Sequence, residues 1–153
     1  MYQRLLVPVD GSPPSDAALT EAIRLARLTG GQIRLLHVVD NLPFVFGAEG
    51  YGGMSTDVIA LLREAGEKIL QQARARVVEA GIAVDTVLGD SPGGRLCDAV
   101  VAQVGAWAAD LVVIGTHGRR GASRVLLGSD AEQVVRHAGI PVLVVRRPEA
   151  PAA

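Results

Sequence analysis

The strongest constraint on the fold is a regular alternation between two hydrophobic patterns. Short apolar runs, of the kind that lie buried on both faces in parallel sheets, recur along the chain. Between them, apolar residues return every three or four positions, which indicates amphipathic helices. Strands that alternate with helices predict a parallel sheet with right-handed crossovers. The predicted strands are 5–9, 33–39, 82–88, 111–114 and 142–145, of which 82–88 alternates like an edge strand.

Local signals mark where the predicted helices begin and end. Ser12 followed by Pro13 predicts the cap and first position of the first helix. Ser129, with Glu132 three residues later, fits a capping box for the last helix. Segment 40–55 has no periodicity and predicts a lid or an interaction loop. The other predicted boundaries are Gly30, Thr56, Gly81, Ser91-Pro92, Trp107 and Gly139.

Composition narrows the class of protein. The 153 residues suit one domain, expected over residues 1–147 with a flexible C-terminal tail at 148–153. No uninterrupted apolar run reaches the roughly 18 residues of a spanning helix. Residues 1–5 lead straight into a strand without an apolar signal core, so we expect a soluble cytoplasmic protein. The net charge of −1 and the 3% aromatic content argue against a nucleic-acid partner.

The fourth strand end carries the clearest candidate site, because open α/β sheets bind ligands at the carboxyl ends of their strands. Gly115 and Gly118 allow close approach of a ligand to the backbone. Gly128-Ser129 lies at a predicted helix N-terminus, which favours phosphate. An alternative is that Gly115 only punctuates the strand and Ser129 only caps its helix. Basic residues in the same turn are Arg119, Arg120 and Arg124.

Several common site types are excluded. The chain has no Gly-x-Gly-x-x-Gly fingerprint after its first strand, no P-loop and no Gly-x-Ser-x-Gly elbow. Cys97 is the only cysteine, and we expect it to be packed inside the protein. His37 and His117 could lie near strand ends, but single histidines in such runs are more often structural, and no zinc-ligand pattern supports them. A phosphate site is therefore the stronger hypothesis.

The spacing Gly115-x2-Gly118-x9-Gly128-Ser129 resembles the nucleotide motif of the universal stress protein family. The resemblance extends to segments 6–12, 36–40 and 141–145, and so covers nearly the whole chain. It implies a single-domain, three-layer α/β/α open sheet of five parallel strands in the order 3-2-1-4-5. This is a Rossmann-like fold of the adenine nucleotide alpha hydrolase type.

The resemblance to the ATP-binding branch of the family also implies a site. Asp10 would lie beside the nucleoside, and Val38 would pack on adenine. By residue type, Asp10 can accept from a ribose hydroxyl or reach a phosphate-bound Mg²⁺, although it can also cap its own turn. Val38 can equally be core. The implied ligands are ATP and Mg²⁺, with Asp10 as the metal contact. The predicted nucleotide-binding residues are Pro8, Val9, Asp10, Val38, Ile114, Gly115, Thr116, His117, Gly118, Arg119, Gly128, Ser129 and Asp130.

Asp130 departs from the family pattern, which usually has an uncharged residue there. A carboxylate suits the first turn of a helix. It also repels phosphate, since two unit charges about 4 Å apart cost roughly 1 kcal/mol in water and more inside a protein. The neighbouring arginines and a Mg²⁺ ion would offset this repulsion, so ATP binding remains the prediction.

Two functions from different classes follow. The first is a stress-response switch in which ATP occupancy sets the state of segment 40–55 and of a homodimer, and so its contact with an unidentified protein partner. Hydrolysis would be slow, because no general base is evident. The second is an ATPase or phosphotransferase, and a nucleotide-free dimeric adaptor is a further alternative. Strand 142–145 is apolar and predicts the dimer contact, because self-pairing would cover it. No membrane partner is expected.

Overall fold

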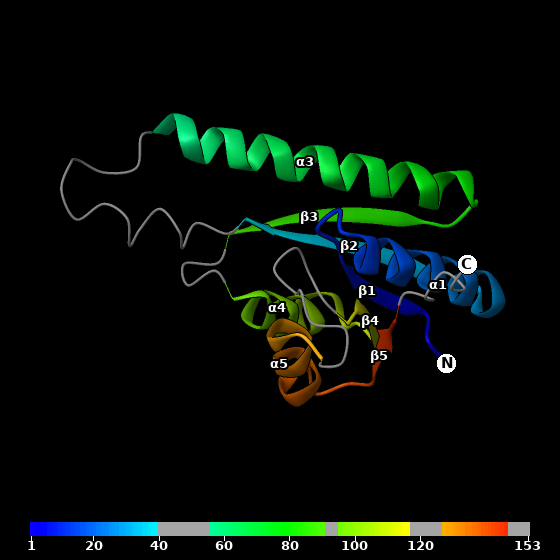
Figure 1. Ribbon diagram of the computed structural model, residues 1–153. Helices are drawn as coiled ribbons and strands as arrows, with labels where there is room; N and C mark the ends of the chain where they lie inside the picture. The colour runs from blue at the N-terminus through cyan, green and yellow to red at the C-terminus, as the bar shows by residue number, and fades with distance from the viewer. Residues whose placement is uncertain (40–55, 91–94, 117–126, 147–153) are drawn as a thin grey trace, which may run out of the picture.

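The computed structural model of the chain describes residues 1–39, 56–90, 95–116 and 127–146. These residues form one five-stranded sheet in the order β3-β2-β1-β4-β5, in which every neighbouring pair is parallel (Figure 1). The predicted fold class and strand order are therefore confirmed. The strands are β1 (Arg4–Pro8), β2 (Gln32–Val39), β3 (Val84–Asp90), β4 (Leu111–Gly115) and β5 (Val142–Val145).

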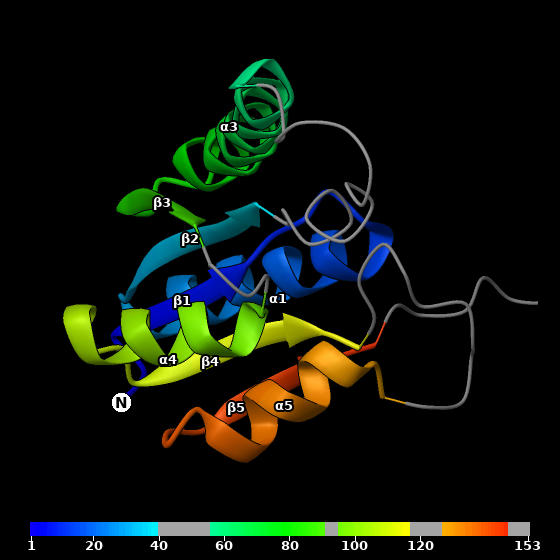
Figure 2. The same cartoon turned by 90° about the vertical axis from the view of Figure 1, so that its left-hand side faces the viewer.

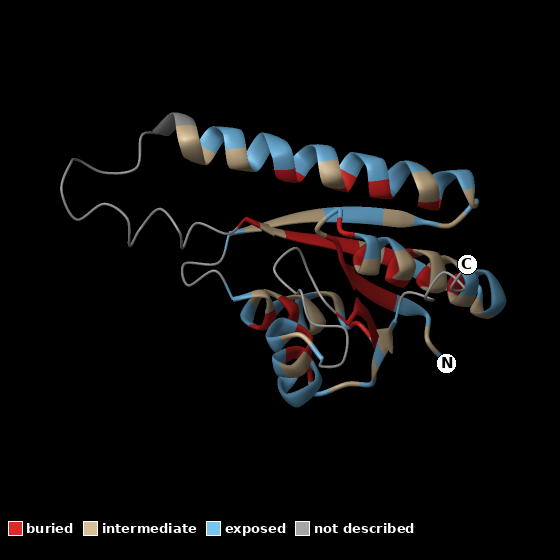
Figure 3. Ribbon diagram, viewed as in Figure 1, coloured by how far each residue is buried: buried red, intermediate tan, exposed pale blue. Residues whose placement is uncertain are grey.

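Helices cover both faces of the sheet and complete the three layers (Figure 2). One face packs against α1 (Pro13–Thr29) and α3 (Thr56–Glu79). The other packs against α4 (Leu96–Trp107) and α5 (Ser129–His137). The central strands β1 and β4 are buried almost throughout, whereas β3 is partly exposed, as its alternation predicted (Figure 3). Two apolar cores therefore lie on either side of a central parallel sheet.

The first helix begins and ends as the sequence predicted. The Ser12 hydroxyl accepts a 3.4 Å hydrogen bond from the Ser15 N–H, and Pro13 occupies the first helical position. Gly30 ends the helix with φ of 69°, a left-handed conformation that glycine adopts without a steric penalty. This helix therefore follows β1 directly, and its N-terminus lies at the carboxyl end of the sheet.

The predicted capping box of the last helix is wrong. Gly128 is the N-cap of α5, and no side chain among the described residues caps the helix. Ser129 is already inside the helix. Glu132 pairs one turn onward with Arg136, with the carboxylate oxygen 2.7 Å from the guanidinium nitrogen, instead of reaching back. The helix therefore begins one residue earlier than the capping box required.

Other boundaries differ by small amounts. Strand β3 runs from 84 to 90 instead of 82 to 88, because its pairing with β2 continues to Asp90 opposite Val39. Helix α4 begins after Arg95. The Ser91-Pro92 signal, segment 40–55 and the tail 148–153 lie outside the described residues. No helix in the described part of the chain is long and apolar enough to cross a membrane.

Candidate functional site

The carboxyl end of β1 is held in a tight turn around Asp10. The Val9 N–H donates to the Leu36 carbonyl at 2.8 Å, which continues the pairing with β2 beyond Pro8. The Asp10 N–H donates to the Ser15 hydroxyl at 3.2 Å, and Asp10 Oδ1 accepts from the Ser12 N–H at 2.9 Å. Asp10 therefore takes the turn-capping role that the sequence left open, with its side chain half-buried at the sheet edge.

The carboxyl end of β4 lies beside the N-terminus of α5. The Thr116 carbonyl accepts a 2.8 Å hydrogen bond from the Gly128 N–H, and the Thr116 N–H donates to the Val145 carbonyl at 3.0 Å. Ile114, Gly115 and Thr116 are all buried. One main-chain hydrogen bond thus joins the Gly115–Thr116 part of the glycine motif to its Gly128–Ser129 part. Eleven residues (117–127) separate Thr116 from Gly128 in sequence.

Gly115 is required by the protein itself. A Cβ at this position would lie 2.6 Å from the Pro14 carbonyl oxygen and 3.0 Å from the Pro14 Cβ, in the first turn of α1. Contacts this short involve backbone and cannot be relieved by rotating a side chain. Sequence reasoning offered ligand approach or strand punctuation for this glycine, and the contact with α1 is a third explanation that no local motif signals.

The predicted site residues within the described chain all lie at one end of the sheet. Pro8 ends β1, which lies between β2 and β4, and Val9 and Asp10 follow it directly. Val38, near the end of β2, is half-buried and packs on the core shared with α4 and α5. Ser129 and Asp130 are exposed in the first turn of α5. The remaining predicted members, His117, Gly118 and Arg119, together with Arg120 and Arg124, lie outside the described residues.

The charges at this end favour an anion at one point and oppose it at another. The N-terminus of α5 presents main-chain N–H groups and the positive end of the helix dipole. Asp130 and Glu132 place carboxylates in the same turn, of which Glu132 is paired with Arg136. No cluster of three or more metal-ligating side chains occurs in the described chain. A single carboxylate such as Asp10 fits a Mg²⁺ ion held mainly by phosphate and water.

Two contacts next to Asp10 were not predicted from the sequence. The buried His37 ring lies with Nδ1 2.7 Å from the Val9 carbonyl oxygen, and Ser15 contacts the Asp10 N–H. The buried, hydrogen-bonded position of His37 agrees with the structural interpretation, but no sequence pattern indicated its partner. A histidine inside an apolar strand was the only available signal.

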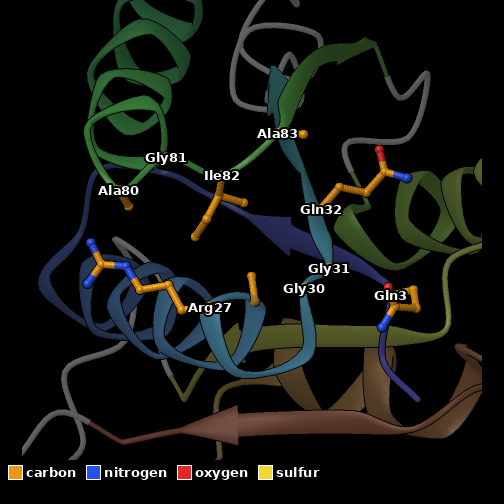
Figure 4. A pocket seen from close by; sticks show the side chains of 10 residues that line it. Gln3, Arg27, Gly30, Gly31, Gln32, Ala80, Gly81, Ile82 and Ala83 are labelled. Carbon is orange, nitrogen blue, oxygen red and sulfur yellow. The ribbon is translucent and has the colours of Figure 1, made fainter.

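A hollow in the described chain lies elsewhere. It is open, about 590 Å³ in volume, and lies at the amino ends of β1 and β2 (Figure 4). Gly30 and Gly81, which follow α1 and α3, contribute to its wall. Open parallel sheets bind ligands at the opposite end, where the carboxyl ends of their strands lie. We therefore place the candidate site at the carboxyl ends of β1, β2 and β4.

Fold and site together define a doubly wound α/β protein with a candidate anion site beside a helix N-terminus. The sequence model of the universal stress protein family matches residues 1–146. A universal stress protein of Methanocaldococcus jannaschii is 35% identical over 97% of this chain and 85% of its own length. The chain therefore belongs to the universal stress protein family.

Solved structures of the family have the same fold. The crystal structure of a family member from Burkholderia pseudomallei aligns with a TM-score of 0.76 and 29% identity, covering 94% of this chain and 96% of that one. A universal stress protein crystallised in complex with cAMP aligns with a TM-score of 0.64 and 25% identity, covering 95% and 97% of the two chains.

Proposed function

We propose that this protein binds ATP together with Mg²⁺ at the carboxyl edge of its sheet and acts as a stress-response switch. The observation that carries the proposal is the hydrogen bond from the Gly128 N–H to the Thr116 carbonyl. It places the N-terminus of α5 beside the end of β4, where the glycine motif needs it for a phosphate. The family member crystallised with cAMP supports an adenine nucleotide as the ligand.

Each strand end has a role in this proposal. Pro8, Val9 and Asp10 hold the nucleoside, and the Asp10 carboxylate contacts a ribose hydroxyl or Mg²⁺. Val38 packs on adenine. Ribose and phosphates lie against two segments, Ile114 to Arg119 and Gly128 to Asp130. In this arrangement the N–H groups and dipole of α5 stabilise the phosphate charge.

Hydrolysis is at most slow in this proposal. Asp10 is occupied with its own turn, where it accepts from the Ser12 N–H. Asp90, at the end of β3, is paired with Arg63. A catalyst of phosphoryl transfer needs a residue that positions the nucleophile, and neither carboxylate is placed for that task. We expect phosphate release well below the roughly 1 per second of an ordinary enzyme.

The proposed switch is a cytoplasmic homodimer that pairs through β5. The Pro141 carbonyl accepts from the Val112 N–H in β4, and the Val145 carbonyl accepts from the Thr116 N–H just after β4. Since main-chain groups alternate in direction along a strand, those of Val142 and Val144 point toward the open edge. Leu143 is 36% exposed at the same edge. Pairing with a second copy would satisfy these groups and cover apolar surface.

Calorimetric titration of the purified protein with ATP and Mg²⁺ tests the proposal. Gly115 is a poor position for a test substitution, because a Cβ there would collide with Pro14. Gly128 has φ of −61° and ψ of 149°, which any residue can adopt, so Gly128→Val introduces no backbone strain. Gly105→Val is the matched control, because a Cβ at Gly105 meets nothing within 4 Å.

We expect saturable micromolar binding that Gly128→Val weakens at least tenfold and Gly105→Val leaves unchanged. Absence of binding at millimolar ATP would overturn the proposal and favour the nucleotide-free adaptor. Fast phosphate release in the same preparation would instead favour the enzyme.

A further inference from the structure

His37 is a polar side chain in a position that packing alone would give to an aliphatic residue. It lies on the face of β2 that packs against α1 and α3, where Ile33, Leu35 and Val39 are also buried. Its own exposure is 9%. The Nδ1 atom is 2.7 Å from the Val9 carbonyl oxygen. Because a carbonyl oxygen can only accept, Nδ1 carries the proton and donates it to Val9.

The fold gives up helix stability to accommodate this ring. Gly66 lies in the interior of α3, where glycine is unfavourable. A Cβ at Gly66 would lie 2.6 Å from His37 Cδ2 and 3.1 Å from Nε2. The ring therefore fills the space that the missing side chain leaves. A buried imidazole and a glycine inside a helix are both unfavourable for stability. Their presence together indicates that the hydrogen bond to Val9 has a role besides packing.

The hydrogen bond acts on the peptide group between Val9 and Asp10. Its carbonyl is held by His37 Nδ1, and its N–H is held by the Ser15 hydroxyl at 3.2 Å. Within the described chain, main-chain pairing between β1 and β2 ends at the bond from Val9 N–H to Leu36. His37 thus supplies the Val9 carbonyl with a partner where the chain leaves the sheet. The C=O and the N–H of this peptide group are therefore both held in place. The direction in which the Asp10 side chain leaves the backbone is fixed with them.

We propose that His37 is a positioning residue, which orients the Asp10 carboxylate toward the sugar of a bound nucleotide by holding the Val9 carbonyl. This inference rests on the proposed function, since it assigns a support to the same site. His37 itself touches no ligand in this assignment. Its loss would leave the base and phosphate contacts in place and would weaken selection for the sugar hydroxyls.

Two substitutions of equal size separate positioning from packing. His37→Asn keeps an N–H donor at the place of Nδ1, whereas His37→Leu has the same shape without a donor. Each variant is titrated with ATP and with 2′,3′-dideoxy-ATP, in the presence of Mg²⁺. The readout is the ratio of the two dissociation constants. A smaller folded fraction raises both constants equally, so the ratio is insensitive to lost stability.

We expect the wild-type protein to bind ATP at least tenfold more tightly than the dideoxy analogue. His37→Asn should keep this ratio within about threefold, whereas His37→Leu should bring it close to 1. Equal ratios in the two variants would overturn the inference, even if both bind more weakly than the wild type. A wild-type protein that binds ATP but does not discriminate would also overturn it. A wild-type protein that binds no ATP would instead refute the proposed function.

Discussion

The contact between Gly66 and His37 predicts an unusual effect of adding one methyl group. Gly66→Ala replaces a glycine in the interior of α3, which by helix propensity alone should stabilise the protein by about 0.5–1 kcal/mol. The new Cβ would lie 2.6 Å from His37 Cδ2 and 2.9 Å from Leu88 Cδ1. The leucine methyl lies at the end of a flexible side chain and can rotate away. The histidine ring is buried and hydrogen-bonded, so it cannot move freely.

The size of the penalty follows from how far the ring must move. Carbon atoms pack best at about 3.5–4.0 Å, so the ring has to shift by roughly 1 Å. Since Cδ2 and Nε2 lie opposite Nδ1 in the ring, a shift of this size compresses or misaligns the 2.7 Å hydrogen bond to the Val9 carbonyl, which is thereby lost. Leaving a buried carbonyl without a partner costs about 1–3 kcal/mol. After the gain in helix propensity, we expect a net loss of about 1–2 kcal/mol in the free energy of unfolding.

Thermal unfolding followed by circular dichroism measures this loss. At this chain length 1 kcal/mol shifts Tm by about 2–4 °C, so Gly66→Ala should lower Tm by about 2–8 °C. Gly105→Ala in α4 is the matched control, because its Cβ meets nothing within 4 Å, and it should raise Tm. If both variants raise Tm alike, the ring moves without cost, and the reasoning about the His37 hydrogen bond is wrong.

Three further predictions test other parts of the molecule. Asp130→Asn should strengthen ATP binding about fivefold, because it removes roughly 1 kcal/mol of repulsion. Asp98→Asn, in the first turn of α4, is the control and should leave the affinity for ATP unchanged. If Asp130→Asn binds ATP no more tightly than the wild type, the repulsion is refuted. Val144→Pro removes an N–H that points to the open edge of β5, and it should convert a wild-type dimer to a monomer in sedimentation equilibrium; a monomeric wild-type protein would contradict the dimer. Burial, followed by the charge of Asp98, raises the pKa of the Cys97 thiol, so at about pH 8 iodoacetamide should modify the native protein at least tenfold more slowly than the unfolded chain. Equal rates would show that the thiol is accessible.

The fold was predictable because its signals are local. Strands β1, β2, β4 and β5 are short, mainly apolar runs, and β3 shows the alternation of an edge strand. Ser12 and Gly30 mark the ends of α1 through contacts within a few residues. The end of β3 was less predictable, since pairing with Val39 extends it to Asp90. Such an extension depends on the partner strand, and no pattern within the segment itself encodes it.

The support of the candidate site was hidden because its contacts join distant residues. His37 and Val9 are 28 positions apart, and Gly66 lies on a third element. The need for glycine at 115 comes from Pro14, about one hundred residues earlier in the chain. The strand-end position of Asp10 could be predicted from the sequence, whereas the orientation of its peptide could not.

Gly115 and Gly128 therefore differ in what a substitution at each position would show about the site. Gly115 has a sufficient reason in the fold, because any side chain there would collide with the main chain of α1. A substitution at Gly115 therefore disrupts packing against α1, whether or not it also affects ligand binding. Gly128 has backbone angles open to every residue, yet its N–H joins the helix N-terminus to β4. Since backbone conformation does not require glycine at 128, Gly128 is the position of the motif at which the proposed approach of a ligand can be tested. Loss of ATP binding in Gly128→Val with an unchanged Tm would separate that role from folding.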